Sequence, residues 1–191
     1  MSKTTIVSGG IADGTIVTAD IADSAVTAAK ASGLGISEAD QYRITSGFTQ
    51  GGSQSIISSN WERADTDGFG KLGTGVSQSS GIFSFASTGV YYITAGAYHS
   101  RNNAAALNAG HSIFTTTDNS SYNSATTAYT CFENTDGKTA GTFSAFIFDV
   151  TNTTTHKAAL YQMCSPDNCS NMGADSTGNY TYITFIRLGD T

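Results

Sequence analysis

Charged side chains are scarce in this sequence. Lys, Arg, Asp and Glu make up 13% of the 191 residues, which is about half of the usual share in soluble domains. Acidic residues outnumber basic ones by 15 to 9, so the formal net charge is −6 at pH 7. Because nucleic acids and anionic membranes attract basic surfaces, we expect neither as a partner.

Long apolar runs are also missing. No window approaches the roughly 18 consecutive apolar residues that a membrane-spanning helix needs, so we expect no membrane insertion. The first residues, MSKTTI, lack the apolar stretch of a signal peptide. We therefore expect a protein that is not exported by the secretory route and is assembled in the cytoplasm.

Cysteine is limited to three residues, Cys131, Cys164 and Cys169. An odd number without a signal peptide indicates free thiols in a reducing compartment. Cys164 and Cys169 enclose Ser-Pro-Asp-Asn, which is a plausible turn, so a local disulfide between them stays open. No second pair of metal-type ligands accompanies the cysteines, and a zinc site is not expected.

The residue patterns of known catalytic and metal sites are absent as well. His99, His111 and His156 are scattered singly, and the sequence contains neither His-Glu-x-x-His nor Gly-x-Ser-x-Gly. Asp65 and Asp67 are not followed by the further oxygen ligands of a calcium loop. We therefore expect no cofactor, no metal ion and no catalytic residue, and we expect that the protein is not an enzyme.

Residues 1–36 contain no aromatic residue, and they carry a ten-residue repeat, IADGTIVTAD followed by IADSAVTAAK. A spacing of five between aliphatic residues fits neither a helix nor a strand. A single copy cannot bury enough apolar surface to fold, whereas several copies, or one copy on another protein, can. We predict an extended anchoring segment, with a flexible low-complexity tail as the alternative. The predicted anchoring residues are Ile6, Ile11, Ile16, Ile21 and Val26.

Residues 37–191 form the second predicted domain. Short runs of aromatic and β-branched residues alternate with turn-forming residues, and no amphipathic helix is evident. This pattern predicts an all-β domain, an antiparallel jelly-roll sandwich of about eight strands. Asp136-Gly137 is a hairpin signal, and Asp118 to Ser121 is a predicted turn. The predicted strands are 41–49, 72–76, 82–85, 90–99, 111–117, 125–132, 142–150, 156–164 and 180–188.

Two of these strands, 142–150 and 180–188, carry apolar side chains on both faces. A two-layer sandwich buries only one face of each strand. The second apolar face therefore needs a partner, and the simplest partner is another copy of the chain. We expect a homo-oligomer.

A pattern of Phe-x-Phe-x-x-x-Gly-x-Tyr is formed by Phe83, Phe85, Gly89 and Tyr91. With this pattern, and with TFSAFIFDV and YTYITFIRL further along, residues 40–191 resemble the jelly-roll fold shared by the globular head of complement component 1q and the tumour necrosis factor family. The resemblance implies a homotrimer with aromatic residues near the threefold axis. The residues expected in the trimer interface or in the core are Tyr91, Ile93, Phe146, Phe148 and Tyr182.

The repeat, together with SEADQYRITSGFT and NWERADTDGFGKLGTG, resembles tail-fibre and virion-appendage proteins of tailed bacteriophages. This second resemblance implies a virion structural protein, a homotrimer that residues 1–36 attach to other virion proteins. A head fibre, a decoration protein or a neck whisker fits the length of the chain equally well.

The alternative function is the tip of a tail fibre that binds a host-surface glycan or receptor. Aromatic and amide side chains in loops can stack on a sugar and hydrogen-bond to it, although ordinary solvent-exposed loops have the same composition. A depolymerase is a third hypothesis, without a nominated catalytic residue. The candidate receptor residues are Asn102, Asn103, Tyr122, Asn123, Asp167 and Asn168.

Overall fold

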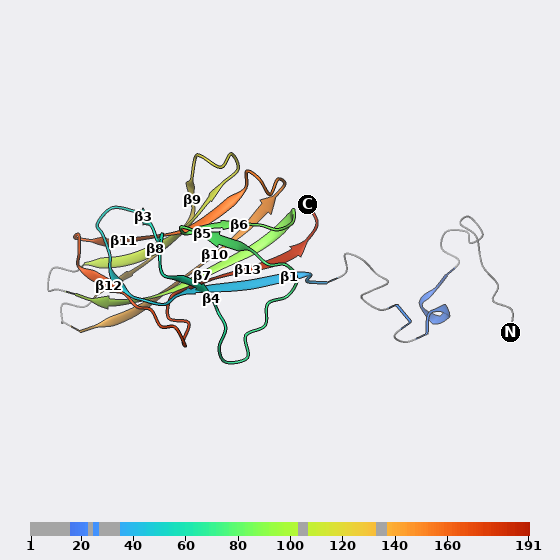
Figure 1. The fold of residues 1–191 in the computed structure, drawn as a ribbon, viewed down its shortest axis with the longest axis horizontal. Coiled ribbons are helices and arrows are strands. Elements are labelled where there is room, and N and C mark those ends of the chain that lie inside the picture. The colour runs from blue at the N-terminus through green and yellow to red at the C-terminus, as the bar shows by residue number, and fades with distance from the viewer. Residues whose placement is uncertain (1–15, 23–24, 27–34, 103–106, 133–136) are drawn as a thin grey trace. The chain divides into compact units, whose positions relative to one another are not determined.

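Figure 1 shows a computed structural model of the chain, which describes residues 16–22, 25–26, 35–102, 107–132 and 137–191. The chain divides into two compact units, Met1–Leu34 and Gly35–Thr191. This division falls two residues before the one that the sequence suggests. Among the described residues, no helix is long and apolar enough to cross a membrane.

The described part of the first unit contains one 3₁₀ turn, η1 (Thr18–Asp20). Asp20 stabilises it, because its backbone N–H donates to Val17 O at 2.9 Å and its carboxylate accepts from Val17 N at 3.0 Å. Four aliphatic side chains of this unit are exposed: Ile16, Val17, Ile21 and Val26. Two of the predicted anchoring residues, Ile6 and Ile11, lie outside the described residues.

The second unit consists of two antiparallel sheets. The first sheet contains, in order, β2 (Phe48–Thr49), β12 (Ser170–Met172), β7 (Gly89–Arg101), β13 (Tyr182–Gly189), β1 (Glu38–Ile44) and β4 (Trp61–Arg63), with β10 (Thr139–Val150) also paired to β7. The second sheet contains β5 (Ser77–Ser79), β6 (Ile82–Ser84), β11 (Lys157–Ser165), β8 (Asn108–Thr116) and β9 (Asn123–Cys131), with β3 (Ser55–Ile56) paired to β11. The predicted all-β sandwich is confirmed.

The core lies between the two sheets and is rich in aromatic rings. Phe83 is at its centre, with the rings of Tyr42, Trp61 and Phe185 at centroid distances of 5.4, 5.2 and 5.1 Å. Edge-to-face and tilted contacts at such distances add to the hydrophobic gain of burial. The inward side chains of β7 complete this core from the first sheet, since every second residue from Tyr91 to His99 is buried.

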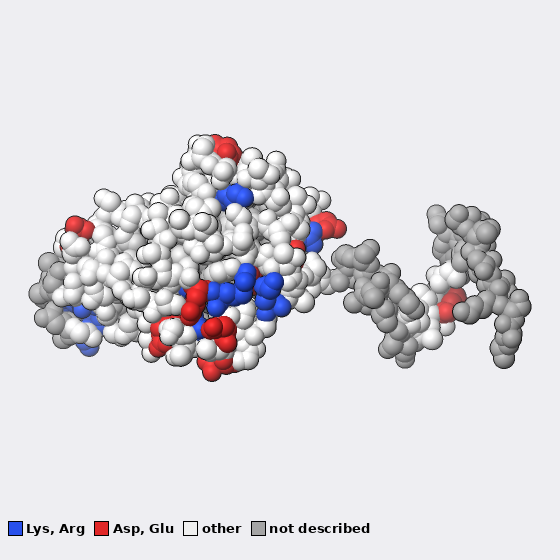
Figure 2. Space-filling model, in the orientation of Figure 1, with Lys and Arg blue, Asp and Glu red and all other residues white. Residues whose placement is uncertain are grey.

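One patch of the surface carries charges of both signs side by side. Figure 2 shows a face on which most side chains are uncharged, while Lys and Arg lie next to Asp and Glu in one patch. Around β1 and β4, ion pairs join Arg43 to Glu62 and Asp65, and Arg63 to Asp40.

The predicted strand 41–49 is wrong as a single element. It is interrupted between β1 and β2. Thr45 N still donates to Asn60 O at 2.8 Å, one position past the last β1–β4 pair, Ile44–Trp61, and β1 ends there. Gly47 lies close to the backbone of β12 in the same chain, and a Cβ at this position would be 2.7 Å from Met172 O. The two halves pair with different strands, β1 with β13 and β2 with β12, and this long-range pairing separates them.

The predicted strand 72–76 is also wrong. Gly73 and Gly75 have φ values of +66° and +72°, in the left-handed region that glycine adopts readily and that interrupts a strand. Only an isolated bridge between Leu72 and Ala39 forms in this segment. The next strand is β5, which begins at Ser77.

The hairpin predicted at Asp136-Gly137 does not join paired neighbours. β9 pairs with β8 in the second sheet, whereas β10 pairs with β7 in the first sheet. The connection therefore crosses from one sheet to the other, and Asp136 lies outside the described residues. The predicted turn 118–121 is confirmed, because it joins β8 to its partner β9.

Among the short strands, β3, β4 and β12 have no counterpart in the prediction. Each has two or three residues and is too short to show an alternating pattern in the sequence. The remaining predicted strands agree with the structure to within three residues at each end.

Candidate functional site

Strand β10 has one side in the core and an apolar side directed outward. Ser144, Phe148 and Val150 are buried, whereas Phe143 and Ile147 are each 60% exposed. Successive side chains of a strand point to opposite faces, so these two sets lie on opposite sides of the first sheet. The outward side of β10 therefore has no cover within this domain.

The apolar surface continues across two neighbouring strands. Directly opposed residues of paired strands lie on the same face, and the register of β10, β7 and β13 gives three rows. We call this surface the outer face. Its rows are Ile147–Tyr92–Ile186, Ala145–Thr94–Thr184 and Phe143–Gly96–Tyr182. None of these nine side chains carries a charge.

A shallow cavity of about 330 Å³ opens at one end of the outer face. Gly96 lines the bottom of this cavity and leaves it open because it has no side chain. Tyr182 packs directly over Gly96, since a Cβ there would lie 2.7 Å from the Tyr182 ring. Tyr98 and Tyr180 stand beside the cavity with ring centroids 5.5 Å apart. Aromatic rings around a hollow can receive an apolar side chain of another protein.

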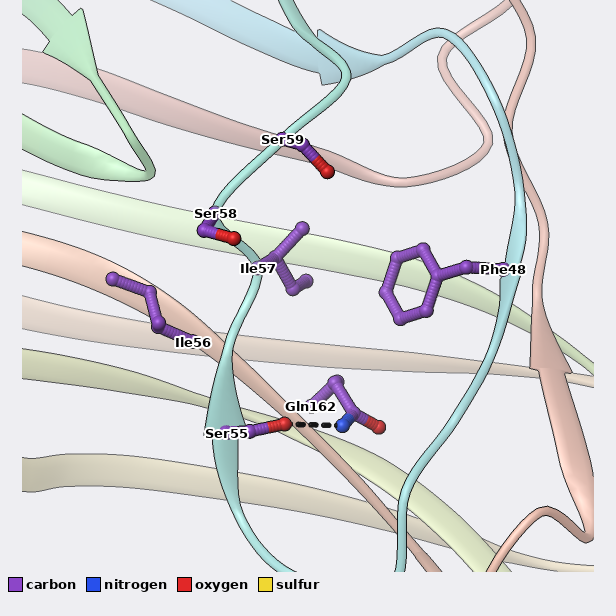
Figure 3. A pocket seen from close by; sticks show the side chains of 7 residues that line it. All are labelled: Phe48, Ser55, Ile56, Ile57, Ser58, Ser59 and Gln162. Carbon is purple, nitrogen blue, oxygen red and sulfur yellow. Dashed lines mark hydrogen bonds between the residues drawn. The ribbon is translucent and has the colours of Figure 1, made fainter.

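A second, smaller pocket of about 200 Å³ lies at the edge of the sandwich (Figure 3). Phe48 approaches it from one side and the segment Ser55–Ser59 from the other. Gln162 lines it too, but its Nε2 donates to Ser55 Oγ at 2.5 Å and its Oε1 accepts from Gly51 N at 3.0 Å. Because the amide is already used within the protein, this pocket offers few polar groups to a ligand.

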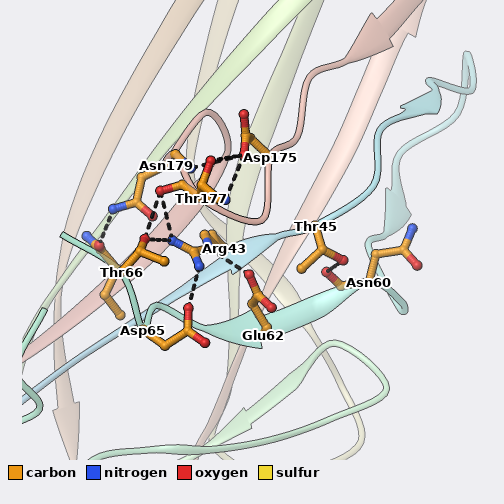
Figure 4. A network of polar contacts seen from close by, with 11 residues as sticks. Arg43, Thr45, Asn60, Glu62, Asp65, Thr66, Asp175, Thr177 and Asn179 are labelled. Atoms are coloured by element: carbon orange, nitrogen blue, oxygen red, sulfur yellow. Dashed lines mark hydrogen bonds and ion pairs between the residues drawn. The ribbon is translucent and has the colours of Figure 1, made fainter.

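The edge of the outer face is covered by loops that Arg43 holds in place (Figure 4). The Arg43 side chain is 1% exposed, and it forms ion pairs with Glu62 at 2.7 Å and Asp65 at 2.6 Å. Its Nη1 also donates to Thr66 Oγ1 at 2.8 Å and to Thr177 O at 3.3 Å. Arg43 thus joins β1 to two loops. The carboxylate of Asp65 is engaged in the ion pair with Arg43.

Asp175 shapes the second of these loops. Its Oδ1 accepts hydrogen bonds from Thr177 N at 2.6 Å, Thr177 Oγ1 at 2.7 Å and Gly178 N at 3.1 Å. These bonds favour the ionised carboxylate and lower the pKa of Asp175. No local sequence pattern indicates the contacts of Arg43, because its partners Glu62 and Thr177 are far from it in the chain.

The residues expected in the interface or the core separate into two groups. Tyr91, Ile93 and Phe148 are in the core, and Phe146 is half-buried against it. Tyr182 is half-buried on the outer face. On β10 the outward positions are therefore Phe143 and Ile147, one residue out of phase with Phe146 and Phe148.

The candidate receptor residues are only partly brought together. Asn102 Nδ2 donates to Asn168 O at 3.1 Å, and Asp167 accepts from Gly52 N at 2.5 Å in the same loop region. Tyr122 and Asn123 follow the turn after β8, at the opposite end of β11 from these loops. Asn103 lies outside the described residues.

Two of the histidines that look isolated in the sequence meet inside the sandwich. Thr142 Oγ1 lies 2.8 Å from His99 Nε2 and 2.7 Å from His111 Nδ1. The chain extends at one end to Gln50 Oε1, 2.8 Å from His99 Nδ1, and at the other to Ser144 Oγ, 2.8 Å from His111 Nε2. Both rings are fully buried.

The direction of this chain follows from the amide of Gln50. Its Nε2 donates to Gly110 O at 3.2 Å and to Met163 O at 3.1 Å, so its Oε1 must accept from His99. With one proton on each ring, the Thr142 hydroxyl then donates to His99 Nε2 and accepts from His111 Nδ1. His111 Nε2 in turn accepts from Ser144 Oγ. A proton added to either ring would disrupt this order.

Burial lowers the pKa of both histidines to about 4. For His99 the charge of His111 lowers the pKa further, and for His111 the carbonyl of Ala95 opposes the effect of burial. Both rings are therefore neutral at pH 7. Among the described residues, no group of three or more His, Cys, Asp or Glu side chains is placed to hold a metal ion.

No family model and no curated protein matches the sequence. Solved structures are similar in fold. Murine APRIL at pH 5.0 has a TM-score of 0.57 and 10% identity over 79% of this chain and 98% of that chain. The tumour necrosis factor Eiger from S. frugiperda has a TM-score of 0.56 and 14% identity over 80% and 93%. The globular domain of zebrafish complement 1qA reaches a TM-score of 0.49 and 9% identity over 79% and 96%.

These likenesses show the fold. The second unit is a jelly roll of the tumour necrosis factor type, and the resemblance drawn from the sequence is confirmed at this level. At such identities they carry no conclusion about ligand, partner or source. The resemblance to bacteriophage appendage proteins stays a prediction.

Proposed function

We propose that the protein is a homotrimeric structural protein of a virus particle. Residues 35–191 form a knob that self-associates through the outer face, and the N-terminal segment attaches the trimer to other virion proteins. The observation that carries the proposal is the outward exposure of Phe143 and Ile147, each 60% exposed on a strand whose other side already fills the core.

Covering the outer face is favourable because of its chemistry. Each Å² of apolar surface removed from water contributes roughly 25 cal/mol. The three rows of the outer face contain only apolar, hydroxyl and glycine residues, so a second copy meets no buried charge there. The number of copies comes from the resemblance to a family that is characteristically trimeric, with aromatic residues near its axis.

The role of the N-terminal segment is supported by its aliphatic residues. Ile16, Val17, Ile21 and Val26 are exposed in the single chain, although apolar side chains gain most from burial. They can be buried against the same segment of neighbouring copies or against another virion protein. The placement on a bacteriophage particle rests on the resemblance of the repeat to virion appendages.

Substitution on the outer face tests self-association. Phe143→Asp or Ile147→Asp places a charge in the proposed interface, and each variant should be a folded monomer by sedimentation and light scattering. Tyr129→Asp is the matched control, because Tyr129 is an aromatic residue with 59% exposure on β9 of the other sheet. A stable trimer of both outer-face variants would contradict the proposed interface.

A second candidate function is recognition of a host-surface glycan. It is favoured by the gathering of Asn102, Asp167 and Asn168 at one end of the sandwich. β1 begins at the other end, where Glu38 pairs with Arg187 near the C-terminus (Figure 1). Asn102→Ala and Asp167→Ala should then lower binding of the full-length protein on a glycan array. Asn123→Ala, at the opposite end of β11, should leave it unchanged.

A further inference from the structure

Two cysteines lie together beneath the loop that joins β11 to β12. Cys164 is the second-last residue of β11, and Cys169 directly precedes β12. Both are buried, and with Ala109 they form a small apolar cluster of their own, covered by the half-buried Phe132. This cluster is distinct from the aromatic core between the sheets.

The backbone fixes the approach of the two residues. Gln50 N donates to Ser170 O at 2.7 Å, and Cys164 N donates to Gly51 O at 2.9 Å. Residues 50–51 thereby tie the end of β11 to the beginning of β12. Asn168 N also donates to Gln50 O at 3.1 Å, which folds the intervening loop back over the cysteines.

The side chains converge from the two ends of this loop. Cys164 Sγ lies 3.2 Å from Gln50 O and 3.1 Å from Pro166 O, and Cys169 Sγ lies 3.8 Å from Asn108 O. The two side chains lie in the same buried cluster. Burial first, and then the neighbouring thiol of Cys164, raise the pKa of Cys169 to about 12. The structure thus holds the pair as neighbouring thiols, with Cys169 protonated at neutral pH.

We propose that Cys164 and Cys169 are a cross-linking site, at which oxidation forms an intramolecular disulfide that closes the loop of residues 165–168. The oxidant is a small-molecule disulfide such as oxidised glutathione. This inference is independent of the proposed trimer, because it concerns a contact within one chain.

The reaction balances as two thiol–disulfide exchanges. One protein thiol loses its proton, and the thiolate attacks the oxidant, forming a mixed disulfide and releasing one small thiolate. The second protein thiol is deprotonated and attacks the protein sulfur of that mixed disulfide, releasing the second small thiolate. The two released thiolates take up the two protons. The protein has lost two hydrogen atoms, and the oxidant has gained two electrons.

The cross-link would stiffen one end of the domain. Cys169 O accepts from Asn102 N at 2.8 Å, and the closed loop carries Asp167 and Asn168. These are the three candidate receptor residues that the fold gathers. Because a disulfide lowers the conformational freedom of the unfolded chain, the oxidised protein should melt at a higher temperature than the reduced protein.

The experiment uses the full-length Cys131→Ser variant, in which only the pair remains. Cys131 is exposed at the end of β9 and would otherwise react with the oxidant by itself. The protein is refolded from denaturant in a buffer of reduced and oxidised glutathione, so that burial of the thiols does not limit access. It is then acid-quenched, alkylated in denaturant and measured by intact and peptide mass spectrometry.

The expected product has lost two hydrogen atoms, carries no alkyl group and yields a peptide linked between Cys164 and Cys169. Two alkylated cysteines, or two glutathione adducts, in the refolded protein would overturn the proposal. The same treatment of the folded protein at alkaline pH provides a second measurement if refolding is inefficient, with the same outcomes. Variants that also carry Cys164→Ser or Cys169→Ser should show no hydrogen loss and no reductant-sensitive change of melting temperature.

Discussion

Two buried histidines are expected to lower the stability of this protein in acid. His99 and His111 lie in a chain of neutral hydrogen-bonding partners that begins at Gln50 and ends at Ser144. Their spacing in the sequence suggests isolated residues. They meet because β10 pairs with β7 in the first sheet, which places Thr142 beside His99, and because His111 on β8 of the second sheet packs against Thr142.

Acid should destabilise the fold through these residues. Their pKa is about 4 in the folded protein and near 6.5 in the unfolded chain. The unfolded state therefore binds more protons between these values, and stability falls as the pH drops from about 6.5 towards 4. The full effect is of the order of 3 kcal/mol for each histidine.

Denaturant unfolding at several pH values measures this effect. His99→Gln should lower the free energy of unfolding. It should also make that free energy depend less on pH between 6.5 and 4. His156→Gln is the control, because the His156 ring bonds to Thr151 and Thr155, outside the chain of His99 and His111. An unchanged pH profile in His99→Gln would argue against the buried histidine as the source.

At the scale of the element, strand β10 illustrates what a sequence pattern can and cannot give. Its apolar residues correctly indicate a strand, and one of its two apolar faces lies in the core. They do not indicate which face points inward, because Phe143 and Ile147 are as apolar as Phe146 and Phe148. The phase is decided by the ladder with β7, which places Ser144 against His111 and Phe148 against Phe85.

Alanine substitutions on the two faces of β10 should behave differently. Phe148→Ala removes a core ring and should lower the free energy of unfolding by about 3 kcal/mol, equally at all protein concentrations. Phe143→Ala should have little effect on the isolated subunit and should weaken the assembly, so its effect on melting should depend on concentration. Thermal unfolding at two concentrations separates these outcomes, and equal behaviour of the variants would contradict the assigned faces.

At the scale of the whole molecule, the chain combines a folded domain with a segment of different composition. The domain has a complete core, and the described part of the segment has exposed aliphatic residues and one short turn. Stability and attachment are therefore expected to reside in different parts of the chain. This separation can be tested without disturbing the knob.

Removal of residues 1–34, the first compact unit, should leave the knob trimeric and abolish its attachment to the particle. Co-sedimentation with particles and light scattering of the free protein measure the two properties. The full-length double variant Ile16→Asp/Ile21→Asp should reproduce the loss of attachment. Attachment of the truncated protein at the full-length level would show that the anchor lies in the knob.

The sequence by itself determined the all-β class, the positions of the long strands, the turn at 118–121 and the change of composition near residue 35. These features depend on local alternation and turn chemistry, which neighbouring residues define. It did not determine the outward phase of β10, the placement of β9 and β10 in different sheets, or the meeting of His99 with His111 and of Arg43 with its partners. Those were decided by the tertiary structure, because each depends on which distant strands pair and in what register.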